Sequence, residues 1–110
     1  MGLTVSSDRR GDSFVVRLEG DLDLHSNAEV RSTVEPLLED RSTEVFLDLQ
    51  GVTFLDSSGL GSLVGLQKRA NRNQSRMTLC GLSPQIEKIF EVTHLRDAFT
   101  ILPELPDVRS

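Results

Sequence analysis

An apolar run at residues 45–49 is followed by Asp56-Ser57-Ser58-Gly59-Leu60-Gly61 and then by an amphipathic segment that extends to about residue 72. The apolar run has the two-residue period of a strand, whereas the later segment repeats its apolar side chains at helical spacing. We therefore expect a strand that passes directly into a helix near Ser58. A helix N-terminus presents unpaired N–H groups and a partial positive charge, so it would stabilise a phosphate acquired by Ser57 or Ser58.

The N-terminal part predicts a β-hairpin followed by a helix. Residues 3–7 and 13–19 are strand-like and are joined by a charged connection that contains a glycine. The helix should begin near Ser26, because Ser26 and Glu29 have the spacing of a capping box. Pro36 removes a backbone donor, so this helix should bend or end at residues 32–35, or restart with Pro36 in a new first turn.

The C-terminal part predicts a helix between two further strands, at residues 77–80 and 98–102. Ser83-Pro84 is a good N-cap followed by proline at the first helical position. In the turn before residue 77, Asn73 is the best candidate for a left-handed backbone conformation.

Two glycines, Gly61 and Gly65, lie one turn apart in the helix that follows Ser58. Each costs roughly 1 kcal/mol of helix propensity relative to alanine. Either they let another backbone or a partner approach closely, or they allow tight packing on the sheet.

The order strand, strand, helix, strand, helix, strand, helix, strand predicts a single α/β domain over residues 1–110. Residues 14, 16 and 18, like 45, 47 and 49, alternate with mostly polar positions, so the mixed sheet should have helices mainly on one face. Residues 3–102 should be ordered, and the proline-containing segment 103–110 should be a flexible tail.

Composition narrows the classes of partner. The net charge of -5 and the isoelectric point near 4.9 argue against nucleic-acid binding and favour protein partners. Apolar runs are short, and no basic segment leads into one at the N-terminus, so we expect no membrane span, no signal peptide and a cytoplasmic protein. One cysteine, Cys80, and two distant histidines give no metal spacing, and no nucleotide loop occurs, so no cofactor or metal is expected.

An enzyme is the weaker hypothesis for the paired serines. A nucleophile elbow needs glycine two positions before and two after the serine, and both Ser57 and Ser58 fail this pattern. His25 and His94 are best explained as a loop residue and a helix-end residue, and two histidines offer few candidates for a general base. A serine hydrolase is therefore disfavoured, and Ser57 alone reads most simply as a helix cap or its neighbour.

The segment 45–66, centred on Phe54-Leu55-Asp56-Ser57-Ser58-Gly59-Leu60-Gly61, resembles the STAS domain of bacterial anti-sigma-factor antagonists. Gly20-Asp21-Leu22-Asp23, and Leu82-Ser83-Pro84 with Ile89-Phe90, resemble the family's other recurring segments. The resemblance covers about residues 3–102.

The resemblance implies a phosphorylatable switch. Unphosphorylated protein would bind a serine-kinase anti-sigma factor and thereby release a sigma factor, phosphorylation of Ser57 would abolish binding, and a separate phosphatase of the PP2C type would reset it. The contact residues it implies are Asp21, Asp23, Asp56, Ser57, Ser58, Gly59, Leu60 and Gly61. The alternative is a STAS module of another signalling assembly, or a sensor of a small anion or lipid at the helix N-terminus.

The chemistry of phosphoserine is consistent with such a switch. A phosphate on Ser57 adds about -1.5 to -2 charge beside Asp56, and the nearest cations in the sequence are Lys68 and Arg69. We therefore expect release through surface charge, without refolding of the domain.

Overall fold

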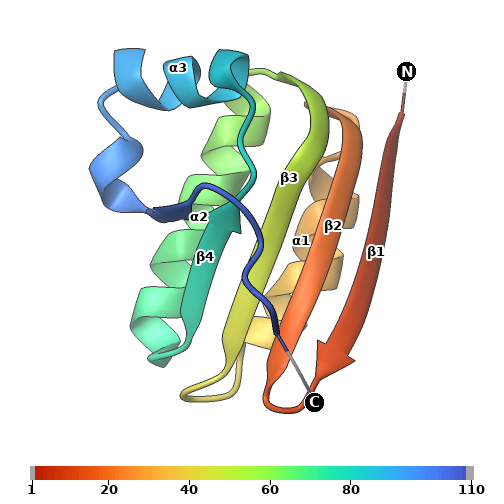
Figure 1. Cartoon of the computed structure of the whole chain (residues 1–110), viewed down its shortest axis with the longest axis vertical. Helices are drawn as coiled ribbons and strands as arrows, with labels where there is room; N and C mark the ends of the chain where they lie inside the picture. Colours follow the sequence, from red (N-terminus) through yellow and green to blue (C-terminus); the bar gives the residue numbers. More distant parts are fainter. Residues whose placement is uncertain (1, 109–110) are drawn as a thin grey trace.

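The structure is a computed structural model and describes residues 2–108. It contains a five-stranded sheet of order β1-β2-β3-β4-β5, in which only β1 and β2 are antiparallel (Figure 1). The elements are β1 (Leu3–Arg10), β2 (Ser13–Leu22), α1 (Asn27–Val34), η1 (Glu35–Leu38), β3 (Glu44–Leu55), α2 (Ser57–Asn73), β4 (Arg76–Cys80), α3 (Pro84–Val92), η2 (Arg96–Ala98) and β5 (Thr100–Leu102). The predicted α/β order and the mixed sheet are confirmed.

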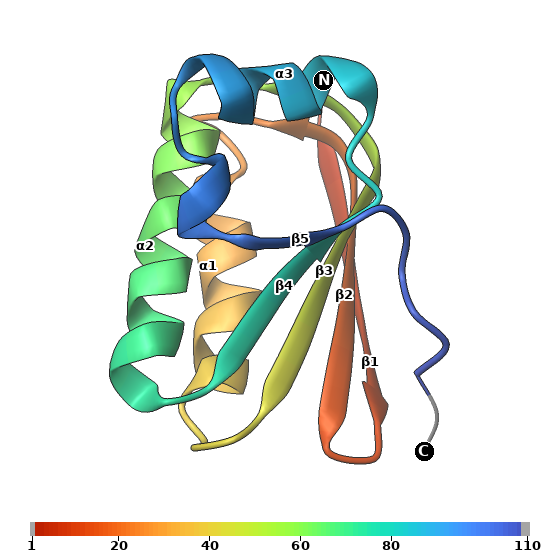
Figure 2. The same cartoon turned by 60° about the vertical axis from the view of Figure 1, so that its left-hand side comes forward.

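Helices α1 and α2 cover one face of the sheet, and α3 lies across the end of the sheet at which β3 passes into α2 (Figure 2). The main core forms between these helices and the sheet, and every second residue of β2 and β3 points into it, including Val16, Leu18, Val45, Leu47 and Leu49. The expectation that helices gather mainly on one face is therefore confirmed.

The opposite face of the sheet carries a smaller apolar cluster of Val15, Phe46 and Cys80. Leu105 and Val108 of the C-terminal segment pack against this cluster, and Arg10 donates to the carbonyl oxygen of Val108 at 3.3 Å. Residues 103–108 thus lie on the sheet, whereas the remaining residues of the expected tail, 109 and 110, are outside the described range. Burial, with the charge of Asp48 as a smaller cause, raises the pKa of the Cys80 thiol to about 11.

Helix α1 begins one residue after Ser26, as expected, but its predicted capping box is wrong. The hydroxyl of Ser26 makes no cap bond to the helix; it accepts from the backbone N–H of Asp23 and donates to the carbonyl of Asp21, both at 2.9 Å. The loop that leaves β2 uses this hydroxyl instead. The prediction for Pro36 is confirmed, since α1 ends at Val34 and Pro36 lies in the first turn of η1.

The left-handed residue before β4 is Gln74, with a φ of 60°, and not Asn73. Asn73 remains helical and its amide donates to the carbonyl of Leu38 at 3.1 Å. Because its side chain is held by η1, the helix continues through Asn73 and the turn follows one residue later. The cap predicted at Ser83 is confirmed, since its hydroxyl accepts from the N–H of Ile86 at 3.3 Å.

Candidate functional site

Strand β3 passes into α2 through one residue, Asp56. Its backbone is extended, and its carboxylate accepts a hydrogen bond from the N–H of Gly59 at 2.8 Å. Asp56 is therefore the N-cap of α2, and of the two alternatives expected for Ser57, a helix cap or its neighbour, the structure shows the neighbour. The backbone N–H of Asp56 donates to the carbonyl of Leu22 at 3.3 Å, which fixes the corner against the end of β2.

Ser57 is the first residue of α2, and its side chain is exposed. Its hydroxyl makes no hydrogen bond with any residue from 2 to 108. Because Asp56 already caps the helix, the hydroxyl of Ser57 is not needed as the N-cap. The hydroxyl is thus open to an approaching enzyme.

The next three positions have different surroundings. Ser58 is half-buried, whereas Gly59 is buried. The carbonyl oxygen of Leu22 lies so close to Gly59 that a β-carbon there would overlap it. Leu60 is 7 % exposed and belongs to the main core. Gly59 and Leu60, for which we expected contact with a partner, therefore pack inside the protein, Gly59 against Leu22 and Leu60 in the main core.

The end of β2 lies beside this corner, because Asp21 pairs with Phe54 and Leu22 pairs with Leu55. The carboxylate of Asp23 accepts from the backbone N–H groups of His25 and Ser26, at 2.9 and 3.1 Å. This Asx turn holds the loop between β2 and α1 in place. Asp21 and Asp23 thus come together with Asp56, which is distant in the sequence, at one end of the sheet.

Two exposed apolar side chains flank the acidic residues, and the sequence did not single them out. Leu24 is 68 % exposed and Phe54 is 50 % exposed. Phe54 follows β3's apolar run in the sequence, so only the register of the strand reveals that it faces solvent. Exposed apolar side chains beside polar groups also occur at protein-docking surfaces.

A groove of about 410 Å³ runs between α1 and α2 and begins at Ser58. Gly61 and Gly65 are both exposed and line it, and no heavy atom outside α2 and their chain neighbours lies within 4 Å of a β-carbon placed on either. Packing of these glycines on the sheet, one of the two explanations left open by the sequence, is therefore wrong. Arg31 of α1 lines the same groove as Ser58, together with Arg69 and Arg72 of α2.

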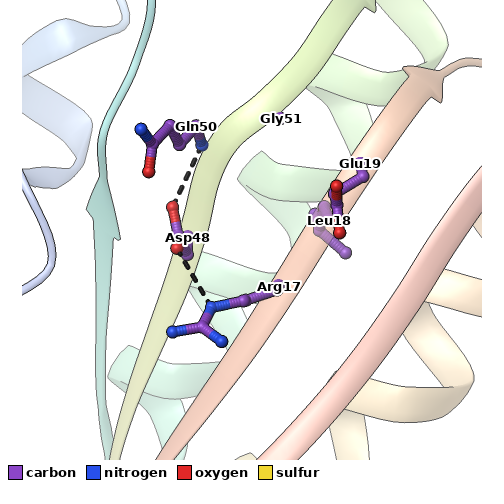
Figure 3. Close-up of a pocket in the computed structure, with 6 residues that line it drawn as sticks. All are labelled: Arg17, Leu18, Glu19, Asp48, Gln50 and Gly51. Carbon is purple, nitrogen blue, oxygen red and sulfur yellow. Dashed lines mark hydrogen bonds and ion pairs between the residues drawn. The ribbon is translucent and has the colours of Figure 1, made fainter.

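A second cavity, of about 290 Å³, lies on the helix-free face between β2 and β3, where a register shift separates the pairs Arg17–Asp48 and Glu19–Gly51 (Figure 3). Asp48 accepts from Arg17 Nε at 3.4 Å and from the N–H of Gln50 at 3.0 Å. The two carboxylates that line this cavity, those of Asp48 and Glu19, oppose the binding of an anion.

Residues 4–108 match the STAS domain family. The chain belongs to this family. It is 30 % identical over 97 residues to the anti-sigma-B factor antagonist of Staphylococcus aureus, a match that covers 88 % of this chain and 90 % of the relative.

Solved structures share the STAS fold. The crystal structure of an anti-sigma factor antagonist from Mycobacterium paratuberculosis has a TM-score of 0.82 at 21 % identity, and covers 94 % of this chain and 88 % of that one. The Bacillus cell fate determinant SpoIIAA in its phosphorylated form has a TM-score of 0.66 at 22 % identity, over 94 % of this chain and 93 % of that one. At these identities the likeness concerns the fold. No helix within residues 2–108 of this STAS protein is long and apolar enough to cross a membrane.

Proposed function

We propose that this STAS protein is a cytoplasmic anti-sigma-factor antagonist, a binding protein and kinase substrate rather than an enzyme. In its unphosphorylated form it binds a serine-kinase anti-sigma factor and so releases a sigma factor. Phosphorylation of Ser57 abolishes this binding, and a PP2C-type phosphatase restores it. The observation that carries the proposal is the exposed, unbonded hydroxyl of Ser57 at the first position of α2.

The proposed contact surface consists of exposed and half-buried groups around Ser57. Leu24 and Phe54 supply apolar area, and Asp21, Asp23 and Ser58 surround it with polar groups. The name of the Staphylococcus aureus relative supports an anti-sigma factor as the partner.

Phosphorylation acts on this surface through charge. The helix N-terminus stabilises a phosphate on Ser57 in the free protein, because the first N–H groups of α2 and the helix dipole favour negative charge. In a complex the same phosphate lies beside Asp56 and loses its water. A hundredfold loss of affinity requires only about 2.7 kcal/mol, which repulsion and desolvation together supply without refolding.

The test is phosphorylation in vitro with the anti-sigma factors encoded in the source genome. The protein is incubated with each candidate and ATP, and its intact mass is measured. We expect one added phosphate on wild type and on Ser58→Ala, and none on Ser57→Ala. A phosphate that persists in Ser57→Ala would show that another residue is the acceptor, and labelling of Ser57 by a fluorophosphonate probe would favour the hydrolase hypothesis instead.

A further inference from the structure

The groove between α1 and α2 starts beside the proposed phosphorylation site, and this position suggests a second contact with the partner. Both helices connect parallel strands of the sheet, so they run side by side in the same direction (Figure 2). The groove is lined by residues of both helices. The groove starts at Ser58, next to the proposed phosphorylation site, and continues past Gly61 and Gly65 to Arg69 and Arg72.

The two glycines are unfavourable for the isolated protein. Each lowers helix propensity relative to alanine, and alanine would meet open space at both positions. By contrast, the neighbouring Gly59 is required, because a side chain there would strike Leu22. Nothing inside residues 2–108 needs glycine at 61 and 65, so the open space over both positions is available to a body outside the chain. Small residues one turn apart let a second helix approach closely.

The floor of the groove contains an unused hydrogen-bond acceptor. Asn27 is 9 % exposed and lines the groove, and its Oδ1 bonds to no residue in the described part of the chain. A buried carbonyl oxygen without a donor is unfavourable in the free protein.

The charge of the groove is opposite to that of the whole chain. Arg31, Arg69 and Arg72 line it with one carboxylate, that of Glu35, while the protein carries a net charge of -5. Arg69 is engaged by the carboxylate of Glu39 and lies 3.8 Å from Glu35. Arg31 and Arg72 form no ion pair with residues 2–108, so two guanidinium groups remain available to carboxylates of an occupant.

We propose that the groove between α1 and α2 binds an acidic helix of the anti-sigma factor. The axis of that helix crosses α2 at Gly61 and Gly65, and its carboxylates pair with Arg31 and Arg72. This inference rests on the proposed function for the identity of the partner. It adds a docking element along α2 to the apolar surface around Ser57.

The groove also strengthens the proposed switch. A phosphate on Ser57 lies one residue from the end of the groove and repels an acidic helix bound there. This repulsion weakens the same complex.

The test measures affinity for an anti-sigma factor that binds wild type, by calorimetry. The variants are Arg31→Glu, Arg72→Glu and Gly65→Leu, with Lys68→Glu and Lys68→Leu as controls, since Lys68 is exposed on α2 outside the groove. We expect a loss of about tenfold or more from each groove variant and less than about twofold from the controls. Gly65→Leu should keep or raise the melting temperature, which separates lost docking from unfolding.

A second arm does not depend on the identity of the partner. An alanine–glutamate helical peptide is titrated into ¹⁵N-labelled protein. We expect changes in the amide chemical shifts of residues 27–35 and 58–72, and we expect these changes to vanish in the double variant that carries both Arg31→Glu and Arg72→Glu. Wild-type affinity of the groove variants for the anti-sigma factor overturns the inference and leaves the proposed function intact. If no anti-sigma factor binds wild type, the proposed function is overturned. The peptide titration then tests the groove by itself, and amide shifts at other residues, or no shifts, overturn the proposal that the groove binds an acidic helix.

Discussion

The carbonyl oxygen of Leu22 accepts a hydrogen bond from the backbone N–H of Asp56 at 3.3 Å, which joins the end of β2 to the N-cap of α2. Through this bond the loop after β2, with Asp23 and Leu24, is held beside Ser57. The proposed docking surface is therefore built on two adjacent parallel strands and does not depend on a mobile loop.

Removal of the cap at Asp56 should destabilise the protein. Asp56→Ala leaves the N–H of Gly59 without its acceptor, and we expect the free energy of unfolding to fall by about 0.5–2 kcal/mol in urea titrations. Asp56→Asn should keep most of the stability, because asparagine caps as well. Ser58→Ala is the control and should stay within about 0.5 kcal/mol of wild type; equal losses in Asp56→Ala and Ser58→Ala would contradict this assignment of the cap.

Alanine at two neighbouring glycines should have opposite effects. Gly59→Ala forces a β-carbon against the backbone of Leu22 and should destabilise the fold by about 1–3 kcal/mol. Gly61→Ala meets open space and should stabilise it by up to about 1 kcal/mol. Thermal unfolding of both variants measures the signs, and destabilisation by Gly61→Ala would show that this glycine is needed within the monomer.

The buried thiol of Cys80 predicts a loss of stability in alkali. Its pKa is raised from 9.0 to about 11 in the folded protein, so above pH 9 the unfolded chain releases a proton that the folded chain retains. The free energy of unfolding should therefore fall between pH 9 and 11, and the contribution of this group is fully present below pH 9. Denaturant titrations at pH 8 and pH 10 measure the fall; Cys80→Ala should show a smaller one, and an identical fall would assign it to other groups.

The same thiol should be unreactive while the protein is folded. Cys80 is fully buried beneath the C-terminal segment, where Leu105 and Val108 pack on its cluster. We expect negligible reaction with a disulfide reagent at pH 8 and full reaction of one thiol in denaturant. Truncation after residue 102 should speed the native reaction, whereas unchanged protection in the truncated protein would show that the segment does not cover the cysteine.

The sequence predicted those features of the fold that depend on local pattern. The junction at Asp56, the end of the first helix before Pro36 and the cap at Ser83 follow from periodicity and from residues with strong positional preferences. These signals depend on a few neighbouring residues, so no tertiary information was needed to interpret them.

The details that differed depend on contacts between distant segments. The sequence left open whether Ser57 caps α2 or neighbours the cap; Asp56 is the cap, and the pairing of β3 with β2 ends at Leu55 directly before it. The hydroxyl of Ser26 binds the loop after β2, and Asn73 is held by η1, so neither performs the role that its local sequence favours. Local propensity was overruled by tertiary hydrogen bonds in both cases.

The surroundings of the candidate site were also invisible in the sequence. Arg31 and Ser58 line one groove because α1 and α2 run side by side, and the exposure of Gly61 and Gly65 follows from which face of α2 packs on the sheet. A sequence pattern gives the period of a helix but not the neighbours that it meets.

The affinity of one anti-sigma factor for this protein, measured by calorimetry before and after stoichiometric phosphorylation of Ser57, tests the central claim most directly. The unmodified protein should bind, and the phosphorylated protein should bind at least about a hundredfold more weakly, a difference of about 2.7 kcal/mol. Equal affinity of the two forms would contradict the account, because the added charge would then have no effect on docking.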